Sequence, residues 1–107
     1  MRVFNRQKKT EQNEPETEMP DGQLVALLVK GDFAAYGQLI RRHQLLINKL
    51  GFVLTGDRKR ASELVVATLM VLWTEREKVK DTIPFPCYLL ELIVRLHKRN
   101  PPYLSDN

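Results

Sequence analysis

The sequence predicts an all-α protein, folded as a compact bundle of three main helices and one short N-terminal helix. Between residues 21 and 99, apolar residues recur at steps of three and four, which places them on one face of a helix. A Gly-Asp pair occurs at 31–32 and again at 56–57, where glycine suits the end of one helix and aspartate the start of the next. No segment shows the alternation of a strand, and no repeat of fixed period is present.

The Gly-Asp pairs mark the ends of the first two predicted helices. We expect Asp21 to cap a short helix that carries Leu24, Val25, Leu27 and Leu28. After Gly31 and Asp32, a long second helix is predicted to continue to about residue 54. Its apolar face is formed by Phe33, Tyr36, Leu39, Ile40, Leu46, Ile47, Leu50, Val53 and Leu54.

The third helix is predicted from about Arg58 to Lys78, and it is apolar on more than one side. Between Ala61 and Trp73 only three residues are polar. One stripe should face the core, formed by Ala61, Val65, Leu69 and Leu72. A second stripe contains Val66, Met70 and Trp73, and either a partner protein or another part of the chain must cover it.

The fourth helix follows a short connection. Asp81 and Thr82 can cap it, and Pro84 suits its first turn. Its core face is predicted to hold Phe85, Leu89, Leu92, Ile93 and Leu96. We therefore divide the chain into a disordered arm (1–18), a helical domain (19–100) and a C-terminal tail (101–107).

Composition narrows the class of protein. The net charge is +4, and residues 22–107 hold thirteen Lys and Arg against eight Asp and Glu, a balance that fits a nucleic-acid partner. A single cysteine, the absence of a secretory signal and the absence of a long apolar run predict a cytoplasmic protein that does not enter a membrane.

The residue types that catalysis needs do not gather in the sequence. His43 and His97 are the only histidines, and neither has a second metal ligand at a zinc-like spacing. We expect Cys87 to be a packed thiol rather than a nucleophile. The sequence therefore predicts no enzyme activity, no metal site and no cofactor.

Several motifs taken together resemble region 2 of the bacterial extracytoplasmic-function sigma factors. They are GDFAAY at 31–36, LIRRH at 39–43, LTGD at 54–57, the helix at 61–73 and FPCYL at 85–89. Their order and spacing match that family across about residues 19–99. The resemblance implies a sigma region 2-like fold and a role in starting transcription.

The resemblance also implies partners. Region 2 docks on the clamp helices of the largest catalytic subunit of core RNA polymerase, and it engages the −10 element of promoter DNA. A separate polypeptide supplying region 4 is a further expected partner, because 107 residues leave no room for that domain, and an anti-sigma factor is another. The residues that the resemblance assigns to protein binding are Glu63, Val66, Ala67, Met70 and Trp73.

The DNA-binding residues are expected on and before the fourth helix: Lys78, Lys80, Tyr88, Arg95, Lys98 and Arg99. Cations near a helix C-terminus are also favoured by the helix dipole, which is an alternative explanation for the last two. The chain departs from the family where Val66 and Ala67 replace a Gln and an acid, and where Arg95 replaces an Asn. These departures leave a second reading open: a sigma-like interaction module that binds a protein without reading DNA.

Overall fold

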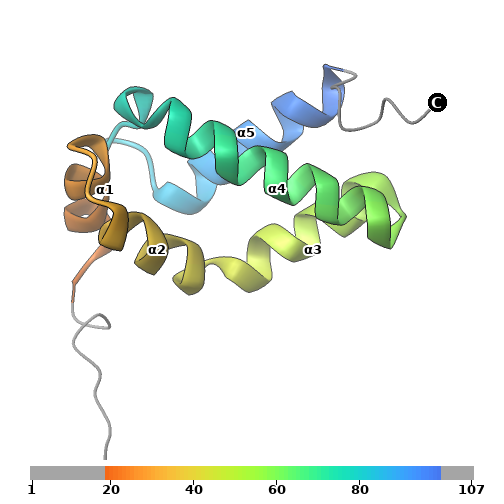
Figure 1. Ribbon diagram of the computed structural model, residues 1–107, viewed down its shortest axis with the longest axis horizontal. Helices are drawn as coiled ribbons and strands as arrows, with labels where there is room; N and C mark the ends of the chain where they lie inside the picture. The colour runs from red at the N-terminus through yellow and green to blue at the C-terminus, as the bar shows by residue number, and fades with distance from the viewer. Residues whose placement is uncertain (1–18, 100–107) are drawn as a thin grey trace, which may run out of the picture.

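The computed structural model describes residues 19–99, which form five α-helices and one short 3-10 helix (Figure 1). These are α1 (Asp21–Val29), α2 (Phe33–Arg42), α3 (Gln44–Thr55), α4 (Arg58–Thr74), η2 (Arg76–Lys78) and α5 (Phe85–Lys98). No strand occurs in this range, so the predicted all-α class is confirmed. The predicted arm and tail lie outside the described residues.

The helices pack around α4. Figure 1 shows α2 and α3 following each other along one side of α4, with α5 crossing behind it and α1 closing one end of the bundle. None of the helices in residues 19–99 has the length and apolar character needed to cross a membrane.

Both Gly-Asp junctions have the predicted geometry. Gly31 and Gly56 adopt positive φ angles of 93° and 70°, a region that glycine enters without steric cost. Asp32 then accepts a hydrogen bond from the backbone N–H of Ala35 at 3.1 Å, and Asp57 accepts one from Arg60 at 2.9 Å. Each aspartate satisfies a backbone donor that would otherwise lack a partner at the start of its helix.

The prediction of one continuous second helix is wrong, because the helix is broken at His43. This residue has φ −112° and ψ 18°, and it separates α2 from α3. Asp21 contacts both residues at the break: one carboxylate oxygen accepts from Arg42 at 2.8 Å, and the other lies 2.8 Å from His43 Nε2. Pro20, not Asp21, occupies the N-cap of α1, and no side chain caps that helix.

The end of the third predicted helix also differs. α4 ends at Thr74, and the chain tightens into η2 before bringing Val79 into the core, where it is 5% exposed. Pro84 is the N-cap residue of α5, without a side-chain cap, so the predicted caps at Asp81 and Thr82 are wrong. Pro86 lies in the first turn, where a missing N–H costs no intrahelical bond.

The core is formed by one side of α4 and by the faces turned toward it. α5 buries all five residues predicted for its core face. On α4 the buried residues are Ala61, Leu64, Thr68 and Leu72, so the stripe predicted through Val65 and Leu69 is rotated, and those two are half-buried at its edge. Thr68 is tolerated in the core because its hydroxyl donates to the Leu64 carbonyl at 2.7 Å.

Two helices approach closely at one glycine. A Cβ at Gly51 of α3 would lie 2.8 Å from Val65 Cγ2 and 3.2 Å from the Ala61 carbonyl oxygen of α4. A methyl group there would force the Val65 side chain to move and the Ala61 backbone to give way by a few tenths of an ångström. Glycine at this position therefore sets the distance between α3 and α4.

We expect Gly51→Ala to lower the free energy of unfolding by about 1–2 kcal/mol, because overpacking this contact outweighs the helix preference of alanine. Urea denaturation measures the change. The matched control is Gly22→Ala in α1, where an added Cβ meets nothing within 4 Å and should stabilise the chain slightly. A Gly51→Ala protein as stable as the parent would contradict the close packing.

Candidate protein-binding surface

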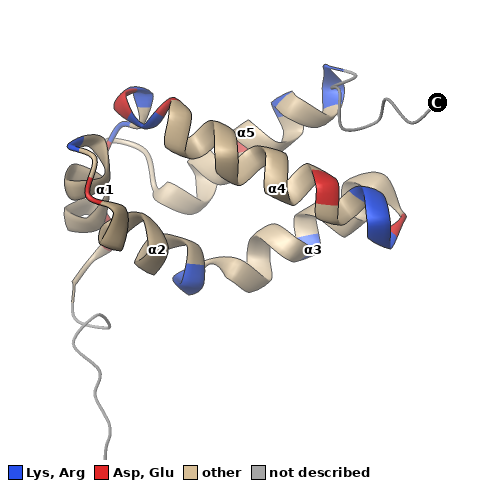
Figure 2. Ribbon diagram, viewed as in Figure 1, with Lys and Arg blue, Asp and Glu red and all other residues tan. Residues whose placement is uncertain are grey.

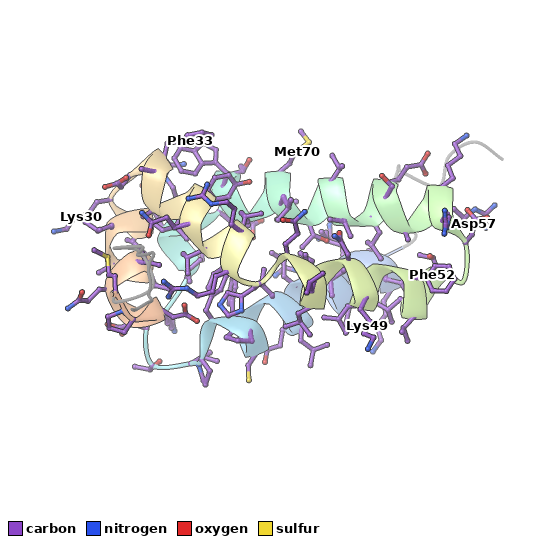
Figure 3. The ribbon with its side chains drawn as sticks, turned by 90° about the horizontal axis from the view of Figure 1, so that it is seen from below. Lys30, Phe33, Lys49, Phe52, Asp57 and Met70 are labelled. Carbon is purple, nitrogen blue, oxygen red and sulfur yellow. The ribbon has the colours of Figure 1, made fainter. Side chains whose placement is uncertain are left out.

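The second stripe of α4 is largely exposed. Met70 is 64% exposed and Val66 is 52% exposed, so neither belongs to the core. At ~100° per residue, Met70 lies about 160° around the helix from buried Thr68. Figure 3 shows Met70 pointing outward from the bundle, on the same side as Phe33. Cover by another helix of residues 19–99 is therefore excluded for these two residues, whereas the N-terminal arm, the other part of the chain considered, lies outside the described residues.

Trp73, the third member of the stripe, is half-buried in an aromatic cluster. Its ring meets Phe33 edge-on at a centroid distance of 5.2 Å and lies 5.1 Å from Tyr36. The Arg76 guanidinium lies 4.3 Å from the centre of the Trp73 ring, and Arg76 also donates to the Trp73 carbonyl at 2.8 Å. Such aromatic and cation–π contacts contribute ~0.5–1.5 kcal/mol each. Trp73 is thereby held in place while part of it stays accessible.

Phe33 extends this surface from α4 onto α2. It is 67% exposed, although its place in the apolar periodicity predicted a core residue. Leu46 and Val53 were also predicted on the apolar face of the second helix, and they too are exposed, at 37% and 69%. The structure gives the reason for Phe33: it directly follows the Asp32 cap and lies about 160° around the helix from buried Ala35.

We define the apolar surface as Phe33, Val66, Met70 and Trp73. Consecutive members are neighbours, through the ring contact between Phe33 and Trp73 and through three- and four-residue steps along α4. The other predicted protein-binding residues, Glu63 and Ala67, are half-buried. Each lies three residues from Val66 or Met70, so they border the apolar surface.

Tyr36 links α2 and α4, the two helices that carry the apolar surface. Its hydroxyl, on α2, donates to the Leu69 carbonyl of α4 at 2.6 Å. Burial raises the pKa of Tyr36 above its ordinary value of 10.0. The bond fixes the position of α2, and with it that of Phe33.

The predicted DNA-binding residues do not form one basic row. Glu75 lies among them: its carboxylate oxygens are 3.1 Å from Arg95 and 3.9 Å from Lys78. Tyr88 is half-buried beside this group, and its pKa is raised by burial and then by the Glu75 carboxylate, against an opposing effect of Arg95. The acid offsets part of the positive charge that was predicted to track a phosphate backbone.

The remaining basic residues lie at the two ends of α5. Lys80 precedes the helix, whereas Lys98 ends its last turn and Arg99 is its C-cap, and all three are exposed. A helix of 14 residues is ~21 Å long, and Figure 2 shows the charged segment around η2 separated from the basic end of α5. The predicted residues are thus spread along α5, with Lys80 at one end, Lys98 and Arg99 at the other, and Arg95 one turn before Lys98.

The histidines and the cysteine of the described part of the chain lie apart from one another in their surroundings. Within residues 19–99, no group of three or more His, Cys, Asp or Glu side chains could hold a metal ion. Cys87 is exposed, so the prediction of a packed thiol is wrong. His43 packs against the Phe85 ring at 5.5 Å and is engaged by Asp21.

No protein-family model, curated protein or solved structure matches this chain.

We expect Tyr36→Phe to lower the free energy of unfolding at pH 7 by about 0.5–1.5 kcal/mol, the contribution of one hydrogen bond. Because the pKa of Tyr36 is raised in the folded state, its contribution is complete below about pH 10 and is lost as the pH rises through the folded pKa. The parent should therefore lose stability more steeply than Tyr36→Phe above pH 10. Urea titrations of both proteins at several pH values measure the two effects. Equal free energies of unfolding for the parent and Tyr36→Phe at every pH would contradict them.

Proposed function

We propose that this chain is a sigma region 2-like docking domain that binds core RNA polymerase through the apolar surface and helps engage the promoter −10 element. The observation that carries the proposal is the exposure of Met70 and Val66 on the stripe that the resemblance assigns to the polymerase clamp helices. The proposal places the protein in the cytoplasm. It includes a second polypeptide, which carries region 4 or is an anti-sigma factor.

The form of the apolar surface supports a role in protein binding. Aromatic residues and methionine are enriched where proteins associate, and a few of them supply most of the binding energy. Trp73 and Phe33 are already held by their ring contacts and by Tyr36, so their rotamers lose little freedom on binding. Met70 is unbranched and adapts to the shape of a partner.

DNA binding has weaker support, and in our proposal it depends on the polymerase. Lys98 and Arg99 present charge at one end of α5, but Arg95 and Lys78 share the Glu75 carboxylate. A few cations give a salt-sensitive affinity that does not depend on sequence. Polymerase would supply the missing affinity by holding this end of α5 against the promoter.

The alternative function is a docking module that binds a protein without reading DNA. The specific observation in its favour is the pairing of Glu75 with both Arg95 and Lys78, because an acid at this position repels phosphate. Both functions use the apolar surface. They differ in whether DNA joins the complex.

We expect Met70→Asp to weaken binding to core RNA polymerase at least about tenfold, because a charge would replace a central apolar contact. Its unfolding midpoint should stay close to that of the parent, since the side chain is 64% exposed. Fluorescence anisotropy of the labelled chain with purified core polymerase measures the affinity.

The matched control is Leu90→Asp, at an exposed apolar position on α5 that should leave polymerase binding unchanged. If the parent chain does not bind core polymerase, the proposal fails. A second titration adds single-stranded −10-like DNA to the complex. DNA affinity that falls in a Lys98→Gln, Arg99→Gln variant supports the sigma-like role, and the absence of any DNA affinity supports the alternative.

A further inference from the structure

A second exposed apolar stripe lies on α3, outside the apolar surface. Leu45 is 86% exposed, Phe52 is 50% exposed and Val53 is 69% exposed. Leu45 and Phe52 are seven residues apart, two turns of helix, and so lie on one line along α3. We call these three residues the α3 stripe. The proposed function makes no use of it.

The α3 stripe borders a groove between α3 and α4. The groove has a volume of about 420 Å³ and is lined by Asn48 and Phe52 from α3 and by Arg58, Ala61, Ser62 and Val65 from α4. Its apolar wall is formed by Phe52, Ala61 and Val65, while Asn48 and Ser62 offer polar atoms. Because Gly51 brings the two helices together beneath it, the groove has a fixed base.

One residue that lines this groove, Arg58, is a cation, and the segment that forms the groove carries a positive formal charge. Residues 44–62 contain Lys49, Arg58, Lys59 and Arg60 against the single acid Asp57, four cations and one anion, a net charge of +3. Figure 3 shows Lys49, Phe52 and Asp57 at the same end of the molecule. The Asp57 carboxylate accepts from the backbone of Arg60 as the α4 cap.

Glu63, the next acid along the chain, does not neutralise the cations beside the groove. Glu63 lies about 140° around α4 from Arg58 at ~100° per residue, on the side away from the groove. Within the described part of the chain, Lys49, Arg58 and Lys59 form no ion pair. Their charge is therefore available to a partner.

We propose that the groove and the α3 stripe bind an amphipathic helix of another protein, with apolar residues at i, i+3/i+4 and i+7 and carboxylates along its flanks. The apolar residues would lie against Leu45 and Phe52, which match the length of about two turns of a partner helix. The carboxylates would face Lys49 and Arg58. This is the helix-in-groove mode of recognition, with charge setting the choice of partner.

The cations beside the groove and the apolar α3 stripe make two other binding partners unfavourable. A second copy of this chain would bring Lys49, Arg58 and Lys59 of both copies together, and such like-charge contacts are unfavourable. A nucleic acid would satisfy the cations but would leave Leu45 and Val53 against a phosphate backbone.

The test uses two synthetic peptides of about 16 residues that carry the same leucine stripe. One has glutamates on its flanks and the other has lysines at those positions. We expect the glutamate peptide to bind the full chain at least about tenfold more tightly than the lysine peptide in fluorescence anisotropy. The Lys49→Glu, Arg58→Glu variant should reverse this preference.

Phe52→Ser should weaken binding of the glutamate peptide at least about tenfold, whereas Leu90→Ser on α5 and Met70→Asp on the apolar surface should leave it unchanged. If Phe52→Ser unfolds, Val53→Ser at a more exposed position replaces it. Equal affinity for both peptides, or no binding of either, overturns the proposal. Sedimentation that shows a dimer dispersed by Leu45→Gln would assign the stripe to a second copy instead.

Discussion

At Gly51, α3 packs against α4 with no side chain between the two backbones. Because no Cβ stands between Gly51 and the Ala61 carbonyl, α3 fits closely against one side of α4. The residues of α4 that turn inward, toward α3 and α5, are Ala61, Leu64, Thr68 and Leu72. The opposite side, with Met70, is then left without cover in residues 19–99. A helix that is apolar nearly all round becomes half core and half surface.

The two surfaces that result differ in chemistry. The apolar surface on α2 and α4 is aromatic and is held in shape by Tyr36 and Arg76, which suits a partner that binds through shape and burial. The groove between α3 and α4 combines the apolar side chains of Phe52, Ala61 and Val65 with the cation Arg58, which suits an acidic amphipathic helix. A domain with two such faces can join two proteins. This organisation is compatible with a sigma region 2-like domain and with an adaptor that binds no DNA. Glu75 bears on the choice between them, because its carboxylate repels the phosphates of DNA.

Features that depend on neighbouring residues were predicted well from the sequence. The junctions at Gly31-Asp32 and Gly56-Asp57 follow from backbone freedom and capping within a few residues. The break at His43 could not be predicted in that way, because Asp21, 22 residues earlier, engages it. The exposure of Met70 was likewise undecided, since periodicity shows that α4 has two apolar sides but not which side other helices cover. The DNA-binding residues were chosen by charge along the chain, and that choice could not show that folding brings Glu75 against Arg95, 20 residues further on.

α4 buries one apolar side and exposes the other. The most direct test compares Leu64→Ala with Met70→Ala by urea denaturation under identical conditions. Leu64 is 0% exposed, so its truncation should cost about 2–5 kcal/mol of the free energy of unfolding or prevent folding. Truncation of Met70 should cost less than about 0.5 kcal/mol, as expected for an exposed site. Equal losses at the two positions would show that Met70 is part of the core and would contradict the account.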